Sequence, residues 1–128
     1  MNLTSSGNET AAHLLESNRI TLMWCAFEGL PRILRTYGTA EIFHPRDERF
    51  AEFARLLPTQ TGTRQYVLVN IDLVQTSCGY AVPLMNYAED RTVLSQWSEK
   101  RGTDGVAAYW AQHNQQSLDG KPTGILED

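Results

Sequence analysis

A nearly continuous apolar run, Arg19-Ile20-Thr21-Leu22-Met23-Trp24-Cys25-Ala26-Phe27, decides the fold of this chain. Apolar or β-favouring side chains occupy both alternating sets of positions, which predicts a strand buried on both faces. A short turn at residues 28–31 follows, and residues 32–43 are typical of a second long strand, so the two segments predict a β-hairpin. Gly38 within the second strand indicates a bulge or a bend.

Helical and strand patterns flank this hairpin on both sides. Asn8 or Ser6 is placed to cap a helix over residues 9–17. After the hairpin, an apolar stripe that starts at Phe50 predicts an amphipathic helix ending near Pro58. The later elements are a strand rich in β-branched residues, a turn-like segment and two helices, at residues 65–74, 77–83, 91–100 and 103–117.

These elements predict one α+β domain over residues 1–118, mainly β with α, and a flexible tail over residues 119–128. Three strands cannot close a barrel, and a small antiparallel sheet exposes two edges that invite pairing. We therefore expect either that the chain dimerises through its sheet or that it is incomplete.

Composition narrows the function. The chain has 128 residues, 41% hydrophobic and 20% charged, as in globular proteins. A net charge of -4 with scattered basic residues argues against nucleic-acid partners. There is no secretory signal and no membrane-spanning run, so a soluble cytoplasmic protein is expected.

Recognisable catalytic and metal-binding motifs are absent from the sequence. Cys25 and Cys78 form no C-x-x-C pair, and the three histidines, His13, His44 and His113, lack metal-ligand spacing. We expect no metal site, and we expect the histidines to be surface residues or helix caps. Hydrolase and kinase signatures are also missing.

Three segments, Ser5–Leu14, Asn18–Trp24 and Ile33–Ala40, resemble the pyridoxamine 5'-phosphate oxidase-like family, in which a phosphate-binding turn leads into a helix and a strand hairpin then crosses the barrel. A fourth segment, Ser77–Met85, is similar to the signature of an uncharacterised subgroup. The resemblance covers nearly the whole chain but begins partway through the family fold. It implies an FMN-binding split β-barrel, incomplete at the N-terminus, with C-terminal helices, working as a cytoplasmic homodimer.

The same resemblance implies a set of FMN-binding residues, which are Ser5, Ser6, Asn8 and Thr10 around the phosphate and Trp24, Cys25, Tyr37 and Cys78 beside the flavin ring. Free N–H groups at a helix start and nearby hydroxyls suit a phosphate. The alternatives are an ordinary helix-capping cluster, aromatic residues packed in a core, and a cysteine acting as a small buried apolar residue.

One departure from the family concerns charge. The oxidases proper place Ser-Arg-Lys where this chain has Asn8-Glu9-Thr10, so the cationic grip on the phosphate is missing there, and Glu9 would repel a phosphate if it pointed inward. Arg19, Arg32 or Arg35 are the candidates to replace that grip, and a deazaflavin is the alternative cofactor.

Two function classes therefore remain open. The first is a flavin-dependent oxidoreductase acting on an unknown small molecule. Pyridoxamine phosphate itself is not the expected substrate, because the C-terminal portion lacks a matching Arg-x-His pair. The second is a non-catalytic dimeric binding or structural module, or a truncated relative, without productive flavin.

Overall fold

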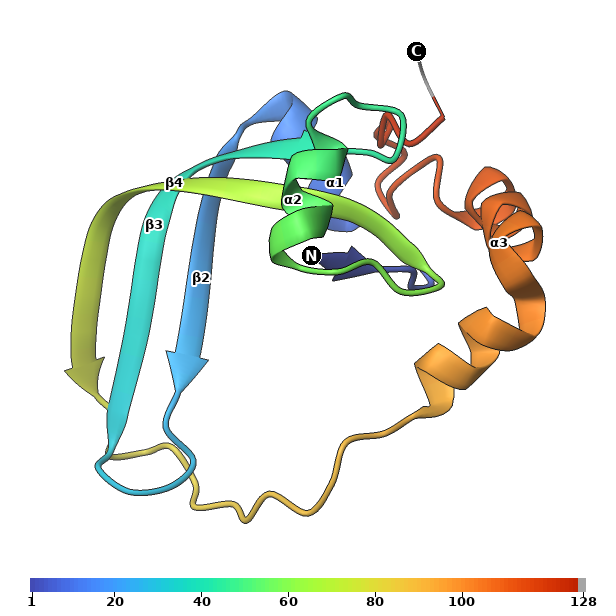
Figure 1. Ribbon diagram of the computed structural model, residues 1–128. Helices are drawn as coiled ribbons and strands as arrows, with labels where there is room; N and C mark the ends of the chain where they lie inside the picture. The colour runs from blue at the N-terminus through green and yellow to red at the C-terminus, as the bar shows by residue number, and fades with distance from the viewer. Residues whose placement is uncertain (127–128) are drawn as a thin grey trace. The chain divides into compact units, whose positions relative to one another are not determined.

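The computed structural model describes residues 1–126 and has an α+β fold of four strands and three helices (Figure 1). Strand order in the sheet is β1-β4-β3-β2, and the pairs β1–β4 and β2–β3 are antiparallel. This fold is consistent with the expected split-barrel class. The elements in chain order are β1 (Asn2–Leu3), α1 (Glu9–Glu16), β2 (Arg19–Cys25), β3 (Arg32–Phe43), α2 (Phe50–Leu56), β4 (Thr63–Cys78) and α3 (Val93–His113).

The chain forms two compact units. Unit 1 contains residues 1–18 and 41–68 and the chain from Arg91 onward, whereas unit 2 contains residues 19–40 and 69–90. No helix among the described residues is both long enough and apolar enough to cross a membrane.

Unit 1 contains most of the buried apolar side chains. Helix α1 buries Ala11, Ala12 and Leu14, as its apolar spacing predicts. Helix α2 packs Phe50 and Phe53 against Tyr66 of β4, with ring centroids 4.8 and 5.8 Å apart. These contacts confirm that an amphipathic helix begins at Phe50.

Unit 2 is built on the predicted hairpin. Strand β2 pairs with β3 in a regular register from Arg19↔Thr39 to Cys25↔Ile33, so no bulge interrupts this pair at Gly38. Gly38 instead permits a close approach of β4, because a Cβ atom there would lie 1.9 Å from the carbonyl oxygen of Asn70. Glycine is required by this contact rather than by an unusual backbone angle.

Several element boundaries differ from those predicted. Strand β4 runs to Cys78, so Ser77 and Cys78 lie in a strand and the turn begins only at Gly79. Strand β1 was not predicted, because two residues carry no periodicity. The two predicted C-terminal helices are confirmed as the halves of α3, which is broken at Gly102.

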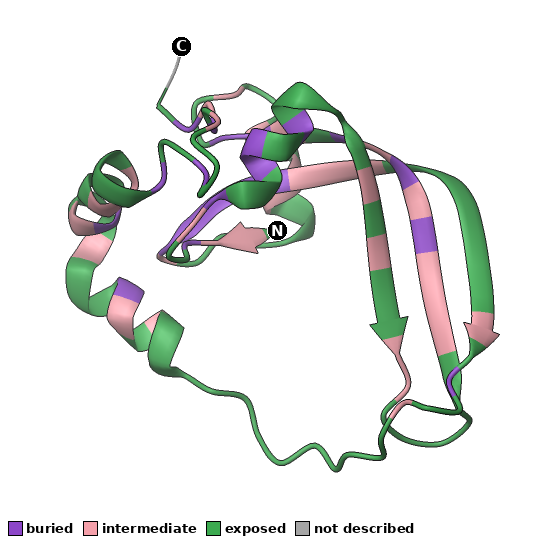
Figure 2. Cartoon of the chain, turned by 180° about the vertical axis from the view of Figure 1, so that it is seen from behind, coloured by how far each residue is buried: buried purple, intermediate pink, exposed green. Residues whose placement is uncertain are grey.

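The prediction that residues 19–27 are buried on both faces is wrong for the described chain. Met23 is 58% exposed and Trp24 50% exposed. Figure 2 shows exposed and intermediate residues alternating along β2. Two apolar residues of β4, Ile71 and Leu73, are exposed as well, at 54% and 58%. An apolar run predicts that both faces of a strand will be buried, but it does not show whether the same chain or another molecule buries them.

The C-terminal segment is packed where a loose tail was expected. Thr123 and Ile125 are buried, and Arg46 donates hydrogen bonds to the carbonyl oxygens of Gly124 (2.5 Å) and Ile125 (2.6 Å). Residues 127–128 of the predicted tail lie outside the described residues. The polar composition of this segment predicts disorder, but its backbone carbonyl groups accept hydrogen bonds from Arg46, which hold it in place.

His44 is another difference from the sequence-based expectation. It is buried rather than on the surface, and its Nδ1 atom has no hydrogen-bond partner among the described residues. Burial, followed by the nearby Arg46 guanidinium, lowers the pKa of His44 below its ordinary value.

Candidate functional site

A surface hollow of about 860 Å³ lies beside the turn at residues 5–7 in unit 1. We call it the anion hollow. Of the predicted phosphate-binding residues, Ser5, Ser6 and Thr10 line it. The other residues that line it are Asn2, Gly7, Glu9, Arg64, His113, Gln116, Ser117 and Leu118.

Arg64, at the start of β4, also lines the anion hollow and contacts the turn at Gly7. Arg64 is only 2% exposed. Its Nη1 atom donates to the carbonyl oxygen of Gly7 (2.8 Å) and to Oδ1 of Asn114 (2.7 Å). Its Nε and Nη2 atoms both donate to Oδ1 of Asn2, at 3.1 and 2.9 Å. The guanidinium therefore ties the turn to β1 and to the end of α3.

The charge of Arg64 has no counter-ion in the described part of the chain. All its acceptors are neutral, and no described carboxylate forms an ion pair with it. Burial lowers the pKa of Arg64 to about 10, so the side chain is still a cation at neutral pH. A buried cation without a paired anion is costly, and an anion in the hollow would relieve that cost.

Asn114 holds this arrangement in place from the opposite side. It is fully buried, and its Nδ2 atom donates to the carbonyl oxygen of Ser5 (3.1 Å). Its own carbonyl oxygen accepts a hydrogen bond from the Thr123 hydroxyl (2.6 Å). The turn, α3 and the C-terminal segment are thus joined through one amide residue and Arg64.

Asn8 occupies the N-cap position of α1 as predicted, but its side chain makes no capping hydrogen bond. Its Oδ1 atom instead accepts from Nε2 of buried Gln65 (3.1 Å), and Asn8 does not line the anion hollow. The first N–H groups of a helix have no acceptor within the helix, and the Asn8 side chain does not satisfy them. The backbone N–H of Ala11 donates to the carbonyl oxygen of Asn8 (3.1 Å), so the N–H groups of Glu9 and Thr10 are the ones available to an anion.

Glu9 lies at the rim of the anion hollow and brings the opposing charge. Its Oε1 and Oε2 atoms both accept from the backbone N–H of Leu118, each at 3.1 Å. This contact directs the carboxylate toward the C-terminal segment. The Glu9 carboxylate is nevertheless exposed and lines the hollow. It would therefore still repel a phosphate there, although less strongly than a carboxylate that pointed into the hollow.

Glu9 also lies near His13 and Asp119, and the ligand-type atoms of the three side chains all fall within 4.8 Å of one another. The sequence did not predict this group, because Asp119 is far from the other two. All three residues are exposed, and Asp119 already interacts with the Ser117 hydroxyl and with Lys121 (3.3 Å). These contacts connect the C-terminal segment to α1.

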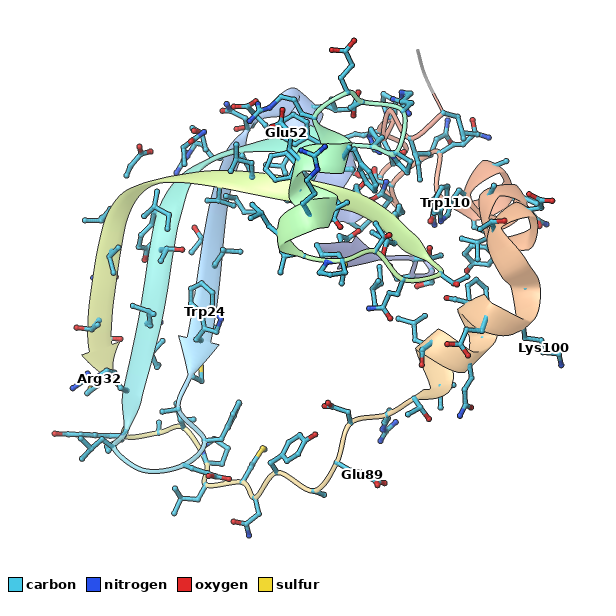
Figure 3. The ribbon with its side chains drawn as sticks, in the orientation of Figure 1. Trp24, Arg32, Glu52, Glu89, Lys100 and Trp110 are labelled. Atoms are coloured by element: carbon cyan, nitrogen blue, oxygen red, sulfur yellow. The ribbon has the colours of Figure 1, made fainter. Side chains whose placement is uncertain are left out.

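The residues predicted to lie beside the flavin ring belong to unit 2. Opposite residues of the antiparallel pair share a face, so Cys25 and Tyr37 lie on one face of the hairpin and Trp24 on the other. Figure 3 labels Trp24 on β2. The Tyr37 hydroxyl donates to Gln75 of β4 (3.1 Å), and Cys78 is the last residue of that strand. The hairpin does not bring all four side chains to one surface.

A second hollow, of about 430 Å³, also borders this turn in unit 1, and we call it the aromatic hollow. Ser5 and Ser6 line both hollows. The remaining lining residues are Thr4, Arg91, Val93, Leu94, Trp97 and Tyr109.

Arg64 is a site residue that the sequence pattern did not predict. The candidate arginines Arg19, Arg32 and Arg35 all belong to unit 2, where Arg35 donates to the Ser77 hydroxyl (3.0 Å). The available signal was an arginine immediately before a strand rich in β-branched residues. Such a charge at the start of a buried strand needs partners, although the sequence does not identify them.

Comparison with known proteins gives a curated relative. No protein-family model matches the chain, and no solved structure matches it. The chain is similar to the curated pyridoxamine 5'-phosphate oxidase family protein ustO of Aspergillus flavus, with 34% identity over 134 aligned residues. The alignment covers 93% of this chain and 54% of the relative, so the chain spans about half the length of that protein.

Proposed function

The chain belongs to the pyridoxamine 5'-phosphate oxidase family, and from this premise we propose that it binds FMN, with the phosphate in the anion hollow. The observation that carries the proposal is Arg64, a buried guanidinium that lines the hollow without a paired carboxylate in the described chain. The Ser6 hydroxyl, Thr10 and the free N–H groups at the start of α1 add neutral donors.

This assignment restores the cationic grip from a different part of the chain. The family pattern supplies positive charge just before the helix, where this chain has Glu9 and Thr10. Arg64 supplies it from β4, through a side chain that hydrogen-bonds the turn at Gly7. Charge-assisted hydrogen bonds to a phosphate contribute about 1.5–3 kcal/mol each, so one such residue is enough to favour FMN over riboflavin.

We further propose that the chain is a flavin-dependent oxidoreductase acting on a small molecule. A bound flavin supplies the electron-transfer chemistry, and the protein binds and orients it. A non-catalytic binding module remains the competing proposal, and the exposed carboxylate of Glu9 at the rim favours it because that charge weakens phosphate binding.

A homodimer is also proposed. Met23 and Trp24 of β2 and Leu73 of β4 are at least half exposed, which leaves apolar side chains of unit 2 uncovered. A second copy of the chain would cover them. Sedimentation equilibrium is expected to give about twice the monomer mass of 14.4 kDa, and a stable, well-folded monomer would contradict the dimer.

A flavin titration tests the FMN proposal. Added FMN is expected to bind at micromolar concentration, with perturbed visible absorbance, to bind more tightly than riboflavin, and to be displaced by inorganic phosphate. Arg64→Met should weaken FMN binding about 10- to 100-fold. The matched control is Arg55→Met, which removes an exposed arginine from α2 and should leave binding unchanged. Wild-type protein that fails to bind FMN, or that binds FMN and riboflavin equally, would refute the phosphate assignment.

A further inference from the structure

A third hollow in unit 1, of about 750 Å³, is lined by residues from both halves of α3 and by the loop at residues 59–63. We call it the acidic hollow, because Glu99 and Asp104 line it and no basic residue of the described chain does. It shares no lining residue with the anion hollow or the aromatic hollow. Its volume is typical of sites for small organic molecules, so it is a separate candidate site.

The loop at residues 59–63 is held closely against α3. Gly62 has φ 93°, and a Cβ atom there would lie 2.5 Å from the Oγ atom of buried Ser98, so this position requires glycine. Within the loop, the N–H of Thr63 donates to the carbonyl oxygen of Gln60 (2.9 Å), and the N–H of Gln60 donates to the Thr63 hydroxyl (2.9 Å). This wall of the hollow is therefore preorganised, which reduces the entropy lost on binding.

Trp110, which Figure 3 labels on the second half of α3, lines the acidic hollow in a fixed orientation. Its Nε1 atom donates to the hydroxyl of buried Thr4 (2.7 Å), and that hydroxyl donates in turn to the carbonyl oxygen of Gly62 (2.9 Å). No aromatic ring or guanidinium of the described residues packs on the Trp110 ring. The face of an indole ring attracts a cation.

The basic residues that follow Glu99 along the chain do not supply that cation. The guanidinium carbon of Arg101 lies 4.6 Å from the ring centroid of Trp97 and 5.4 Å from that of Tyr109, two rings whose centroids are 5.0 Å apart. Both rings line the aromatic hollow. Neither Arg101 nor Lys100 lines the acidic hollow.

Glu99 and Asp104 are exposed, and neither forms an ion pair within the described part of the chain. Asp104 lies in the first turn of the second half of α3, where the helix dipole favours a negative charge. Glu99 lies in the last turn of the first half, where the dipole disfavours one. Helix electrostatics therefore do not account for Glu99, whereas a cation in the hollow would stabilise both carboxylates.

The remaining polar lining offers hydrogen-bond acceptors. Thr59, Thr61 and Thr103 line the hollow, and each hydroxyl oxygen can accept an N–H bond. A primary ammonium group has three N–H donors, so it can bond to a carboxylate and to these hydroxyl groups together. The carbon chain that carries the ammonium group suits the apolar faces of Phe50 and Trp110 in the same lining.

We propose that the acidic hollow binds a primary alkylammonium ion, whose charge pairs with Glu99 and Asp104 and whose carbon chain packs against Trp110. This ligand is distinct from the flavin of the proposed function, because the acidic hollow and the anion hollow have no lining residue in common.

Fluorine NMR of protein labelled with 5-fluorotryptophan tests the site in the unaltered sequence. The chain has three tryptophans, Trp24, Trp97 and Trp110, whose resonances can be assigned from single Trp→Phe variants. Butylammonium chloride, at neutral pH and constant ionic strength, should shift the Trp110 resonance saturably and leave the other two in place. The neutral alcohol n-butanol, which has the same carbon chain, should shift none of them. Absence of a saturable Trp110 shift, or an equal shift with n-butanol, would overturn the proposal.

Calorimetry on charge variants gives a second readout. Glu99→Gln and Asp104→Asn should each weaken butylammonium binding about two- to fivefold, the range for a solvent-accessible ion pair, and the double variant about tenfold. Glu89→Gln is the matched control, because it removes an exposed carboxylate of unit 2, and it should leave the affinity unchanged. Wild-type affinity in the double variant, with unmoved Trp24 and Trp97 resonances as evidence of an intact fold, would overturn the assignment. FMN affinity should not change in the double variant, so this proposal and the FMN proposal can fail separately.

Discussion

Replacing Arg64 by methionine separates the two roles that the structure gives this residue. The guanidinium holds the turn through Gly7 and Asn114, and it lines the anion hollow. Methionine has a similar apolar stem but no charge and no donor. The variant should therefore lose some stability without ligand and most of the stabilisation that an anion provides.

The cost without ligand comes from opposing contributions. Asn114 is fully buried, so its Oδ1 atom loses its Arg64 partner without gaining water, at about 1–3 kcal/mol. Asn2 and Gly7 are only half-buried and can be rehydrated. Removing a cation whose pKa is lowered to about 10 by burial relieves a desolvation cost. We expect a net decrease of about 1–2 kcal/mol in the free energy of unfolding.

The ligand-dependent part is larger and has a defined size. At a phosphate concentration of 100 Kd, the wild type should gain about 2.7 kcal/mol. Four of the five N–H donors of Arg64 are engaged within the chain, which leaves one for the phosphate. A loss of affinity of about 10- to 100-fold, from that one charge-assisted bond, reduces the gain to about 0.4–1.4 kcal/mol in the variant at the same concentration.

Urea unfolding measured by circular dichroism, with and without phosphate at constant ionic strength, provides both values. Arg64→Lys serves as an intermediate, because it keeps the charge but cannot make all four hydrogen bonds. Arg55→Met serves as the exposed control. If Arg64→Met gains as much stability from phosphate as the wild type, Arg64 does not form the anion site and the reasoning fails.

Three further predictions concern other features of the structure. Glu9→Gln keeps an acceptor for the Leu118 N–H but removes the rim charge, so calorimetry should show phosphate binding a few-fold tighter; unchanged affinity would mean that the carboxylate does not act on the hollow. The lowered pKa of His44 means that the unfolded chain binds more protons below about pH 6.5, so the free energy of unfolding should fall from pH 6.5 toward 5, and His44→Gln should flatten that slope in urea titrations. Gly38→Ala forces a Cβ atom to within 1.9 Å of a backbone oxygen and should cost about 3 kcal/mol, whereas Gly105→Ala in α3 should change stability by less than about 1 kcal/mol; equal effects in unfolding experiments would contradict the close approach.

Local patterns in the sequence determined most of the secondary structure. The hairpin, the helix beginning at Phe50 and the break between the two halves of α3 all follow from residues a few positions apart, through apolar periodicity and glycine placement. The helix that begins at Glu9 is predicted in the same way, from the candidate cap residues Asn8 and Ser6. Such features depend on backbone preferences and on side-chain spacing, both of which are visible along the chain.

Only the tertiary structure decided which charge lies beside the turn at residues 5–7. Arg64 reaches Asn2, Gly7 and Asn114, which are separated from it by about fifty to sixty residues, and no spacing rule links them. The packed C-terminal segment and the meeting of Trp97 with Tyr109 have the same origin. A buried cation and a buried amide must find partners wherever the fold brings them. The sequence by itself therefore determined the turn and the helix that follows it, and the tertiary structure decided which cation lies beside them.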